Sequence, residues 1–368
     1  MTSTSIPFLD LRPGDEGTEV RAAIDRVIAR GWFVLGPEVE AFEAEFAAAS
    51  GARHAVGVAN GTDAIALLLR ASGIAPGDEV VVPAMTAAFT ALAVISTGAR
   101  PVFADIDPDR LTMDPGACNA AVTSRTRAIV TVHLYGQPAD SEAIYRVAER
   151  HGLAVIEDCC QAHLATCAGV PVGTRGAGGA FSFYPTKNLG ALGDGGAIVT
   201  NDAAIANRVR VLRNGGQADR YHHVEAGINS RLDEIHAAVL RAKLPLLPTL
   251  TARRRALAAA YRRHLPQSIQ QVPEFDAGHV YHLFPVRSQE RDGLQVHLRT
   301  AGVETLIHYP IALPQQEAFK AFAPAECPVA ARAARELLSL PLHPRLDEAD
   351  VARVVDSVAA FQNGRVPA

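Results

Sequence analysis

The feature that most constrains the fold is an alternation of short β-branched runs with helical patterns between about residues 51 and 202. Such an alternation is typical of a mainly parallel sheet covered by helices on both faces. Some runs, such as Val80-Val81-Val82, are continuously apolar, as strands buried on both faces are. We predict seven strands, at His54–Ala59, Glu79–Pro83, Pro101–Asp105, Ala128–His133, Ala154–Asp158, Ala180–Tyr184 and Gly196–Thr200.

Beyond Asn201 the pattern becomes mainly helical. The chain of 368 residues is long enough for two cores. We divide it into a large α/β domain of residues 1–249, which includes the N-terminal segment, and a smaller C-terminal α/β domain of residues 250–368. Within this half the predicted helices are Ala203–Leu212, Asp233–Leu247, Arg253–Leu265, Pro328–Leu338 and Glu348–Phe361, and the predicted strands are Tyr281–Arg287 and Glu304–His308.

Composition argues against several classes of protein. Lys and Arg total 35 against 39 Asp and Glu, and no long basic run occurs, so we expect no nucleic-acid partner. Apolar runs fall short of the roughly 20 residues that span a bilayer, and the N-terminus does not resemble a signal peptide. We therefore expect no membrane partner and a cytoplasmic location. The five cysteines, with Cys159 and Cys160 adjacent, indicate reduced thiols, and no metal site is predicted because paired CxxC spacing is missing.

A lysine in a loop rich in glycine and proline is the first candidate for chemistry. The segment Gly178 to Gly190 is typical of a strand that ends in a loop of fixed backbone around Lys187. A lysine delivered into a cleft loses its proton more readily than a surface lysine, and the neutral amine adds to carbonyls. A Schiff base with a substrate or with pyridoxal phosphate is therefore the chemistry to consider, while a solvated charge is the alternative for any single lysine.

Two carboxylates, Glu157 and Asp158, end an apolar strand at the edge where α/β sheets bind ligands. A buried carboxylate needs a partner, and a protonated pyridine nitrogen would suit Asp158, although a helix cap or a structural ion pair would also explain it. Gln161 is placed to reach the same site as a hydrogen-bond donor. His163 is either a further site residue or a packed core histidine.

The turn Asn60-Gly61-Thr62-Asp63 follows a strand and opens a helix. Free backbone N–H groups and the positive end of the helix dipole make such a turn a candidate phosphate site, to which Thr62 adds a hydroxyl. Ordinary helix capping is the alternative explanation. Ser182, five residues before Lys187, is a second candidate phosphate contact.

Together with Asn229-Ser-Arg231-Leu-Asp-Glu, these segments resemble the DegT/DnrJ/StrS-type sugar aminotransferases, which are fold-type I pyridoxal phosphate enzymes. The resemblance runs from Phe8-Leu-Asp-Leu to Leu340-Pro-Leu-His343. It implies that Lys187 binds pyridoxal 5'-phosphate as a Schiff base, that Asp158 pairs with the pyridine nitrogen, and that Gln161 lies beside the phenolic oxygen. It also implies a phosphate site formed by Gly61, Thr62, Ser182 and, from the neighbouring subunit of a homodimer with shared active sites, Asn229.

The resemblance further implies an aminotransferase that converts a ketosugar, expected to be nucleotide-linked, to an aminosugar with glutamate as amino donor. Two alternatives remain: a cyclitol or other small ketone as substrate, or a non-catalytic regulatory or binding protein on the same fold. Two positions depart from the family pattern. Ala87 stands where many members have an aromatic residue that stacks on the cofactor, and Pro314 precedes Gln315 where members often have a second histidine.

Overall fold

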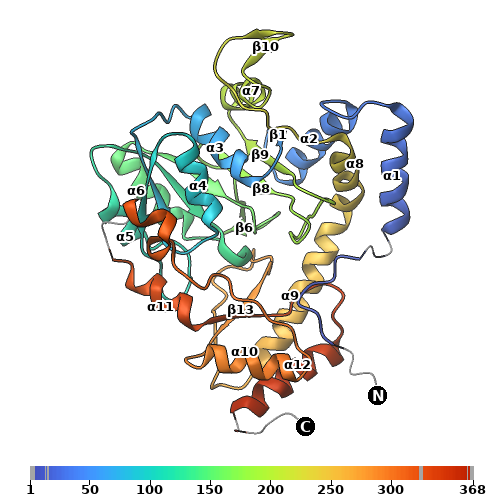
Figure 1. The fold of residues 1–368 in the computed structure, drawn as a ribbon, viewed down its shortest axis with the longest axis vertical. Helices are drawn as coiled ribbons and strands as arrows, with labels where there is room; N and C mark the ends of the chain where they lie inside the picture. The colour runs from blue at the N-terminus through green and yellow to red at the C-terminus, as the bar shows by residue number, and fades with distance from the viewer. Residues whose placement is uncertain (1–4, 13, 15, 323–325, 363, 365–368) are drawn as a thin grey trace.

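The structure is a computed structural model that describes residues 5–12, 14, 16–322, 326–362 and 364, and its centre is a seven-stranded sheet (Figure 1). The strand order is β1-β9-β8-β5-β4-β2-β3, and only β9 runs antiparallel to its neighbours. The predicted α/β class with a mainly parallel seven-stranded sheet is therefore confirmed. The strands are β1 (His54–Val58), β2 (Glu79–Pro83), β3 (Arg100–Ala104), β4 (Thr126–Val132), β5 (Ala154–Asp158), β8 (Gly178–Ser182) and β9 (Gly196–Thr200).

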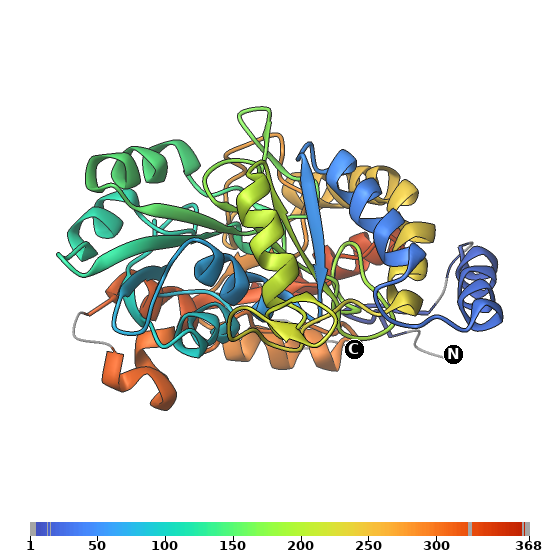
Figure 2. The ribbon, with the colours of Figure 1, turned by 90° about the horizontal axis from the view of Figure 1, so that it is seen from above.

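Both faces of the sheet are covered by helices, and consecutive strand residues belong to different cores. Val80 and Val82 pack into the core that contains α3 (Gly61–Ala71), whereas Val81 packs into the core that contains α6 (Ser141–His151). This alternation is what a strand buried on both faces produces. The other covering helices are α4 (Ala88–Ser96) and α7 (Ala203–Leu212) on the α3 face, and α2 (Pro37–Ala49), α5 (Pro115–Ala121) and α8 (Glu234–Lys243) on the other (Figure 2).

The predicted bounds of β2, β5 and β9 are confirmed, but those of β8 were wrong by two residues. β8 begins at Gly178, which pairs with Ile156, and it ends at Ser182. The aromatic residues that follow suggested a longer strand, yet Phe183 leaves the sheet and packs its ring edge-on against Phe42 and Phe46. Lys187 consequently lies in a loop, five residues after the last residue of β8.

A second, three-stranded antiparallel sheet lies in the C-terminal part of the chain, with β13 between β12 and β14. The predicted strand Glu304–His308 is wrong, because this segment joins β14 through the single bridge of Leu306 with Ser339. The predicted helix to Leu338 is too long, since β14 already starts at Leu337. The elements are α9 (Leu247–His264), β12 (Gln270–Gln271), β13 (Phe284–Arg287), α10 (Arg291–Thr300), α11 (Pro328–Glu336), β14 (Leu337–Leu340) and α12 (Glu348–Gln362).

The predicted domain boundary between residues 249 and 250 falls inside α9, and the division into two domains stays a prediction. Across the described ranges, no helix combines the length and the apolar character that crossing a bilayer requires. The remaining elements are short apart from α1: α1 (Gly17–Arg30), β6 (Thr166–Cys167), β7 (Val170–Pro171), β10 (Gln217–Asp219), β11 (His222–His223), and the 3-10 turns η1 (Leu134–Gly136), η2 (Leu244–Leu246), η3 (Leu313–Gln315) and η4 (Glu317–Phe322).

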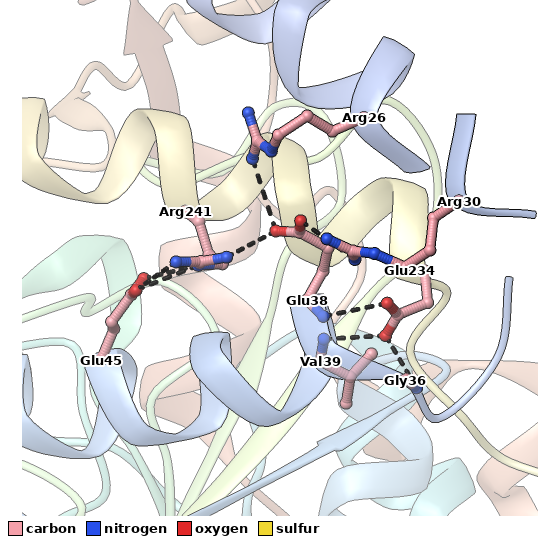
Figure 3. Close-up of polar contacts among 8 residues, drawn as sticks. All are labelled: Arg26, Arg30, Gly36, Glu38, Val39, Glu45, Glu234 and Arg241. Atoms are coloured by element: carbon pink, nitrogen blue, oxygen red, sulfur yellow. Dashed lines mark hydrogen bonds and ion pairs between the residues drawn. The ribbon is translucent and has the colours of Figure 1, made fainter. Parts of the chain in front are cut away.

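Two buried glutamates join α1, α2 and α8 (Figure 3). Glu234, at the start of α8, accepts hydrogen bonds of 2.8 to 2.9 Å from the amides of Gly36, Glu38 and Val39, which are the unpaired donors at the start of α2. Glu38 is paired in turn with Arg26, Arg30 and Arg241, the last of which also pairs with Glu45.

The charge on Glu38 is maintained by its arginine partners. Burial alone would raise the pKa of Glu38, but hydrogen bonds from Arg241 and Arg26 outweigh it and hold that pKa below its usual value of 4.5. A buried carboxylate that stays ionised keeps its arginine partners in place. The segment before α8, which includes Asn229, is therefore attached to a helix whose start is firmly held.

We expect Glu234→Ala to lower the free energy of unfolding by about 3 kcal/mol or more, because three buried amides lose a charged acceptor. Glu45→Ala is the matched control from the same network: its side chain is 42% exposed, and the loss of an exposed ion pair costs about 1 kcal/mol or less. Urea unfolding followed by circular dichroism compares the two variants. Equal losses would contradict a special role for Glu234.

Candidate active site

The carboxyl ends of β5 and β8 and the start of α3 meet at one place. A Cβ atom built on Gly61 would lie 2.6 Å from Sγ of Cys160 and 2.9 Å from Cβ of Ser182, so a larger residue at position 61 would overlap both. Asp158 is the last residue of β5, and Ser182 is the last residue of β8. The structure therefore brings Gly61, Asp158 and Ser182 to the same edge of the sheet, as ligand sites of α/β folds require.

The start of α3 leaves backbone donors open. Asn60 caps the helix, with its Oδ1 accepting from the amide of Asp63 at 2.8 Å. The amides of Gly61 and Thr62, in the first turn, have no acceptor within the described ranges. Open amides at the positive end of a helix dipole suit a phosphate group, and Ser182 lies against the same turn.

Asp158 is only 5% exposed, and each of its carboxylate oxygens accepts one hydrogen bond. Oδ2 accepts from Oγ1 of Thr90 at 2.8 Å, and Oδ1 accepts from the amide of Cys160 at 3.1 Å. Oγ1 of Thr90 in turn lies 3.3 Å from Oγ1 of Thr86. The carboxylate keeps lone pairs for one more donor, such as a ring N–H. Sequence analysis missed Thr90, whose only signal is its place one helical turn after Thr86.

Glu157 precedes Asp158 but points to the opposite face of the sheet. Its oxygens accept from Nε2 of His133 and from the hydroxyl of Tyr145, both at 2.9 Å. Nδ1 of His133 accepts from the amide of Ala139, so the ring hydrogen is on Nε2 and points at Glu157. Sγ of Cys159 and one possible metal-ligating atom each of His133 and Glu157 lie within 4.8 Å of one another. Hydrogen bonding already accounts for the closeness of His133 and Glu157.

Lys187 is half-buried, and its amine has no hydrogen-bond partner in the described part of the chain. Its amide donates to the carbonyl of Tyr184 at 2.8 Å, which closes the turn that carries it. Burial lowers the pKa of Lys187, and the negative charge of Asp158 acts against this shift. A larger fraction of the amine is therefore neutral and nucleophilic than for a surface lysine.

Gln161 is buried and connects two parts of the chain that are far apart in sequence. Its Oε1 accepts from the amide of Tyr135 at 2.6 Å, and its Nε2 donates to the hydroxyl of Tyr309 at 3.0 Å. The hydroxyl of Tyr135 donates to the carbonyl of His308. Burial and the charge of Asp158 raise the pKa of Tyr309, so its hydroxyl stays protonated and acts as a neutral hydrogen-bonding group. Neither tyrosine was predicted as a site residue, although Tyr309 lies in the quoted His308-Tyr-Pro motif.

His163 is a fully buried histidine beside the same site. Its ring packs against Phe181 and Phe183, and Nε2 donates to the carbonyl of Ser182 at 2.8 Å. Burial, together with the charge of Lys187, lowers the pKa of His163 to about 3. Of the two interpretations left open by the sequence, the packed histidine fits this environment, and its hydrogen bond also holds the backbone of Ser182.

Three predicted positions remain: Asn229, Ala87 and Pro314. Asn229 is exposed, with no side-chain hydrogen bond among the described residues, and the hydroxyl of Ser230 next to it accepts from the amide of Ala59 at 3.0 Å. Ala87 immediately precedes α4, and Phe89 in its first turn is 62% exposed. Pro314 lies in η3, whose Leu313 amide donates to the carbonyl of Ala84 at the end of β2.

The described residues provide what pyridoxal phosphate requires. Asp158 is a buried acceptor for a ring N–H, and Lys187 offers a partly desolvated amine. The first turn of α3 offers the open amides of Gly61 and Thr62 to a phosphate. Gln161 and Tyr309 add neutral hydrogen-bonding groups between them. These are the groups by which proteins orient and tune this cofactor.

Comparison with known proteins agrees with this chemistry. Residues 15–359 match the model of the DegT/DnrJ/EryC1/StrS aminotransferase family. The chain is 48% identical over 360 residues to dTDP-3-amino-3,4,6-trideoxy-alpha-D-glucose transaminase of Streptomyces venezuelae, covering 96% of this chain and 95% of the relative. It is 45% identical over 366 residues to UDP-N-acetyl-3-dehydro-alpha-D-glucosamine 3-aminotransferase of Acidithiobacillus ferrooxidans, covering 98% and 99%.

The fold also matches that of a solved crystal structure. The crystal structure of DesV from S. venezuelae in complex with a ketimine intermediate superimposes with a TM-score of 0.93 at 47% identity. The match covers 97% of this chain and 98% of DesV. The match therefore extends over nearly the whole chain.

The pKa of Lys187 leads to a prediction about its reactivity in the protein without cofactor. With trinitrobenzenesulfonate, labelling of Lys187 should reach half its maximal rate below pH 10.5, the ordinary lysine pKa, because burial favours the neutral amine. Asp158→Asn should move this midpoint lower still, since the charge that raises the pKa is removed. Peptide mapping separates the three lysines, and exposed Lys320 is the internal reference. A midpoint for Lys187 at or above that of Lys320 would contradict the burial argument.

Proposed function

The chain belongs to the DegT/DnrJ/EryC1/StrS aminotransferase family of pyridoxal phosphate enzymes, and we propose that it transfers an amino group from glutamate to carbon 3 of a nucleotide-linked ketosugar. The observation that carries this proposal is the meeting of Lys187, Asp158 and the open start of α3 at one sheet edge. When bound, pyridoxal phosphate acts as an electron sink for the carbanion formed at the amine-bearing carbon. Every other task falls to the residues of the chain.

Each site residue has a task that its contacts support. Asp158, oriented by Thr90, would hold a proton on the ring nitrogen. Lys187 would move a proton between the reacting carbon atoms, and its lowered pKa leaves more of its amine neutral than in a surface lysine. Gly61 and Thr62 would bind phosphate through their amides, with Ser182 beside them. Gln161 would orient the phenolic oxygen of the cofactor. The hydroxyl of Tyr309 accepts a hydrogen bond from Nε2 of Gln161 and so holds this side chain in place.

The substrate proposal follows the printed activities of two relatives that align over nearly the whole chain. One relative acts on a dTDP-linked sugar and the other on a UDP-linked sugar, and both names place the amino group at carbon 3. We therefore propose a 3-ketosugar nucleotide without specifying the base. Glutamate as donor and a cytoplasmic location are further parts of the proposal that come from the sequence.

The proposed activity can be tested with nitrogen-15-labelled glutamate and a panel of dTDP- and UDP-linked 3-ketosugars generated in the reaction mixture. We expect the label in the aminosugar nucleotide by mass spectrometry, and no labelled product with Lys187→Ala. If the protein converts a cyclitol ketone but none of the ketosugars, the cyclitol ketone becomes the proposed substrate. Absence of turnover on every ketone, with no cofactor trapped on Lys187 by borohydride, would favour the non-catalytic alternative.

We also propose a two-fold homodimer in which Asn229 of each subunit reaches the phosphate held by the other. Large apolar side chains stand exposed in the segments around the site: Trp32 is 54% exposed, Tyr184 is 51% and Leu192 is 53%. Val34 pairs with Asp233, which places the segment of Trp32 beside that of Asn229. Exposed apolar groups next to an unpartnered polar residue support a surface covered by a second copy.

Mixing Lys187→Ala chains with Asn229→Ala chains tests this arrangement. If Asn229 acts across the interface, each heterodimer contains one intact site, and random pairing should restore about a quarter of wild-type activity. If Asn229 acts within its own subunit, no heterodimer contains an intact site. Activity that stays at the level of the separate variants, after native mass spectrometry has confirmed chain exchange, would refute the shared site.

A further inference from the structure

The residue next to Lys187 is held by a segment that is more than 90 positions away in sequence. Nδ2 of Asn188 donates to the carbonyl of Val280 at 3.1 Å, and Oδ1 of Asn188 lies 3.1 Å from Nδ1 of His282. Asn188 and His282 are both buried, with 9% and 6% of their surface exposed. Val280 and His282 therefore contact the loop of Lys187 directly, through the amide side chain of Asn188.

The two contacts of Asn188 determine the hydrogen position on His282. A carbonyl oxygen only accepts, so the amide nitrogen of Asn188 must face Val280 and its oxygen must face His282. Nδ1 of His282 is then the donor, and Nε2 is left with a lone pair. Nε2 has no hydrogen-bond partner within the ranges described. Burial, helped by the charge of Lys187, lowers the pKa of His282 well below 6.5, which keeps the ring neutral.

The segment that carries His282 is itself anchored on two sides. The amide of Val280 donates to the carbonyl of Gly136 at 3.0 Å, and a Cβ on Gly136 would lie 3.0 Å from the amide nitrogen of His282. From α9, Nε of Arg255 donates to the carbonyl of His279 at 2.9 Å. Gly136 follows β4, so the segment is wedged between the large sheet and α9. A tie to such a segment restricts the movement of Asn188.

We propose that His282 is a positioning residue that acts through Asn188 to hold the amine of Lys187 in the orientation needed for covalent capture of a carbonyl. The proposal rests on the proposed role of Lys187, but not on the identity of the ketone. In the capture step the amine of Lys187 adds to the aldehyde carbon of pyridoxal phosphate, and loss of water leaves a C=N bond. A misplaced amine slows this step more than it weakens the noncovalent binding of the phosphate.

The variants separate the donor from the ring. His282→Asn keeps an amide N–H close to the place of Nδ1, whereas His282→Phe keeps the ring volume without a donor. His279→Phe is the matched control, because His279 is 4% exposed in the same segment, its Nδ1 accepts from the amide of Tyr281, and no hydrogen bond between its side chain and the Lys187 loop occurs among the described residues. Asn188→Ala removes the same hydrogen bond with His282 from the side of the Lys187 loop. It replaces His282→Phe in the test if that variant does not fold.

The readout is the rate of covalent bond formation after pyridoxal phosphate is added to the protein without cofactor. It is followed by absorbance and by borohydride trapping with peptide mapping, while equilibrium dialysis of Lys187→Ala combinations measures noncovalent binding. We expect His282→Phe and Asn188→Ala to slow the covalent step about tenfold or more with noncovalent affinity changed less than about threefold. His282→Asn and His279→Phe should stay within about threefold of wild type.

Two results would overturn the positioning role. One is a wild-type rate in both His282→Phe and Asn188→Ala. The other is a loss in His282→Asn as large as that in His282→Phe, which would make the ring or its Nε2 atom, and not the contact with Asn188, the important feature. Failure of wild-type protein to trap the cofactor on Lys187 is a different outcome, because it rejects the proposed function on which the inference rests.

Discussion

The site depends on the close approach of α3 to the ends of β5 and β8. Gly61 allows this approach, because any side chain there would overlap Cys160 and Ser182. The approach places the open amides of the first turn beside the last residues of two strands. Without it, the backbone donors, Asp158 and the Lys187 loop would still exist but would not face a common space. One glycine contact therefore makes a cofactor site out of three separate sequence segments.

The alternation of side chains along β5 separates structure from chemistry. Glu157 and Asp158 are neighbours, yet they lie on opposite faces and have different partners. Glu157 accepts one hydrogen bond on each oxygen, from His133 and Tyr145, so it stabilises the sheet interior. Asp158 has one hydrogen bond to each oxygen and remains able to accept another. The two carboxylates accept equal numbers of hydrogen bonds, so their surroundings distinguish them: the charge of Asp158 acts on Lys187, whereas the partners of Glu157 lie in the sheet interior.

The sequence predicts those parts of the fold that depend on local patterns. β2, β5 and β9 were predicted with the observed bounds because each contains three consecutive apolar residues. The strand predicted at Glu304–His308 was wrong because its apolar alternation belongs to a segment that meets β14 at one bridge. Within the site, Lys187 was predicted from its loop rich in glycine and proline, and Asp158 from its place at the end of an apolar strand. Thr90, Tyr309 and His282 were not, because each acts through a partner between 68 and 148 positions away, and no local pattern records such contacts.

The electrostatics of the site follow from the burial that these distant contacts produce. Burial and the charge of Lys187 lower the pKa of His308 to about 4, as they lower those of His163 and His282. Three imidazoles close to Lys187 are thus neutral at neutral pH and act only as hydrogen-bonding groups. A protonated imidazole there would repel the ammonium form of Lys187 and compete with a ring N–H for the charge of Asp158. Neutral histidines leave that charge to the ring partner, so the same packing that hides the histidines from water also prepares Asp158 and Lys187 for their proposed work.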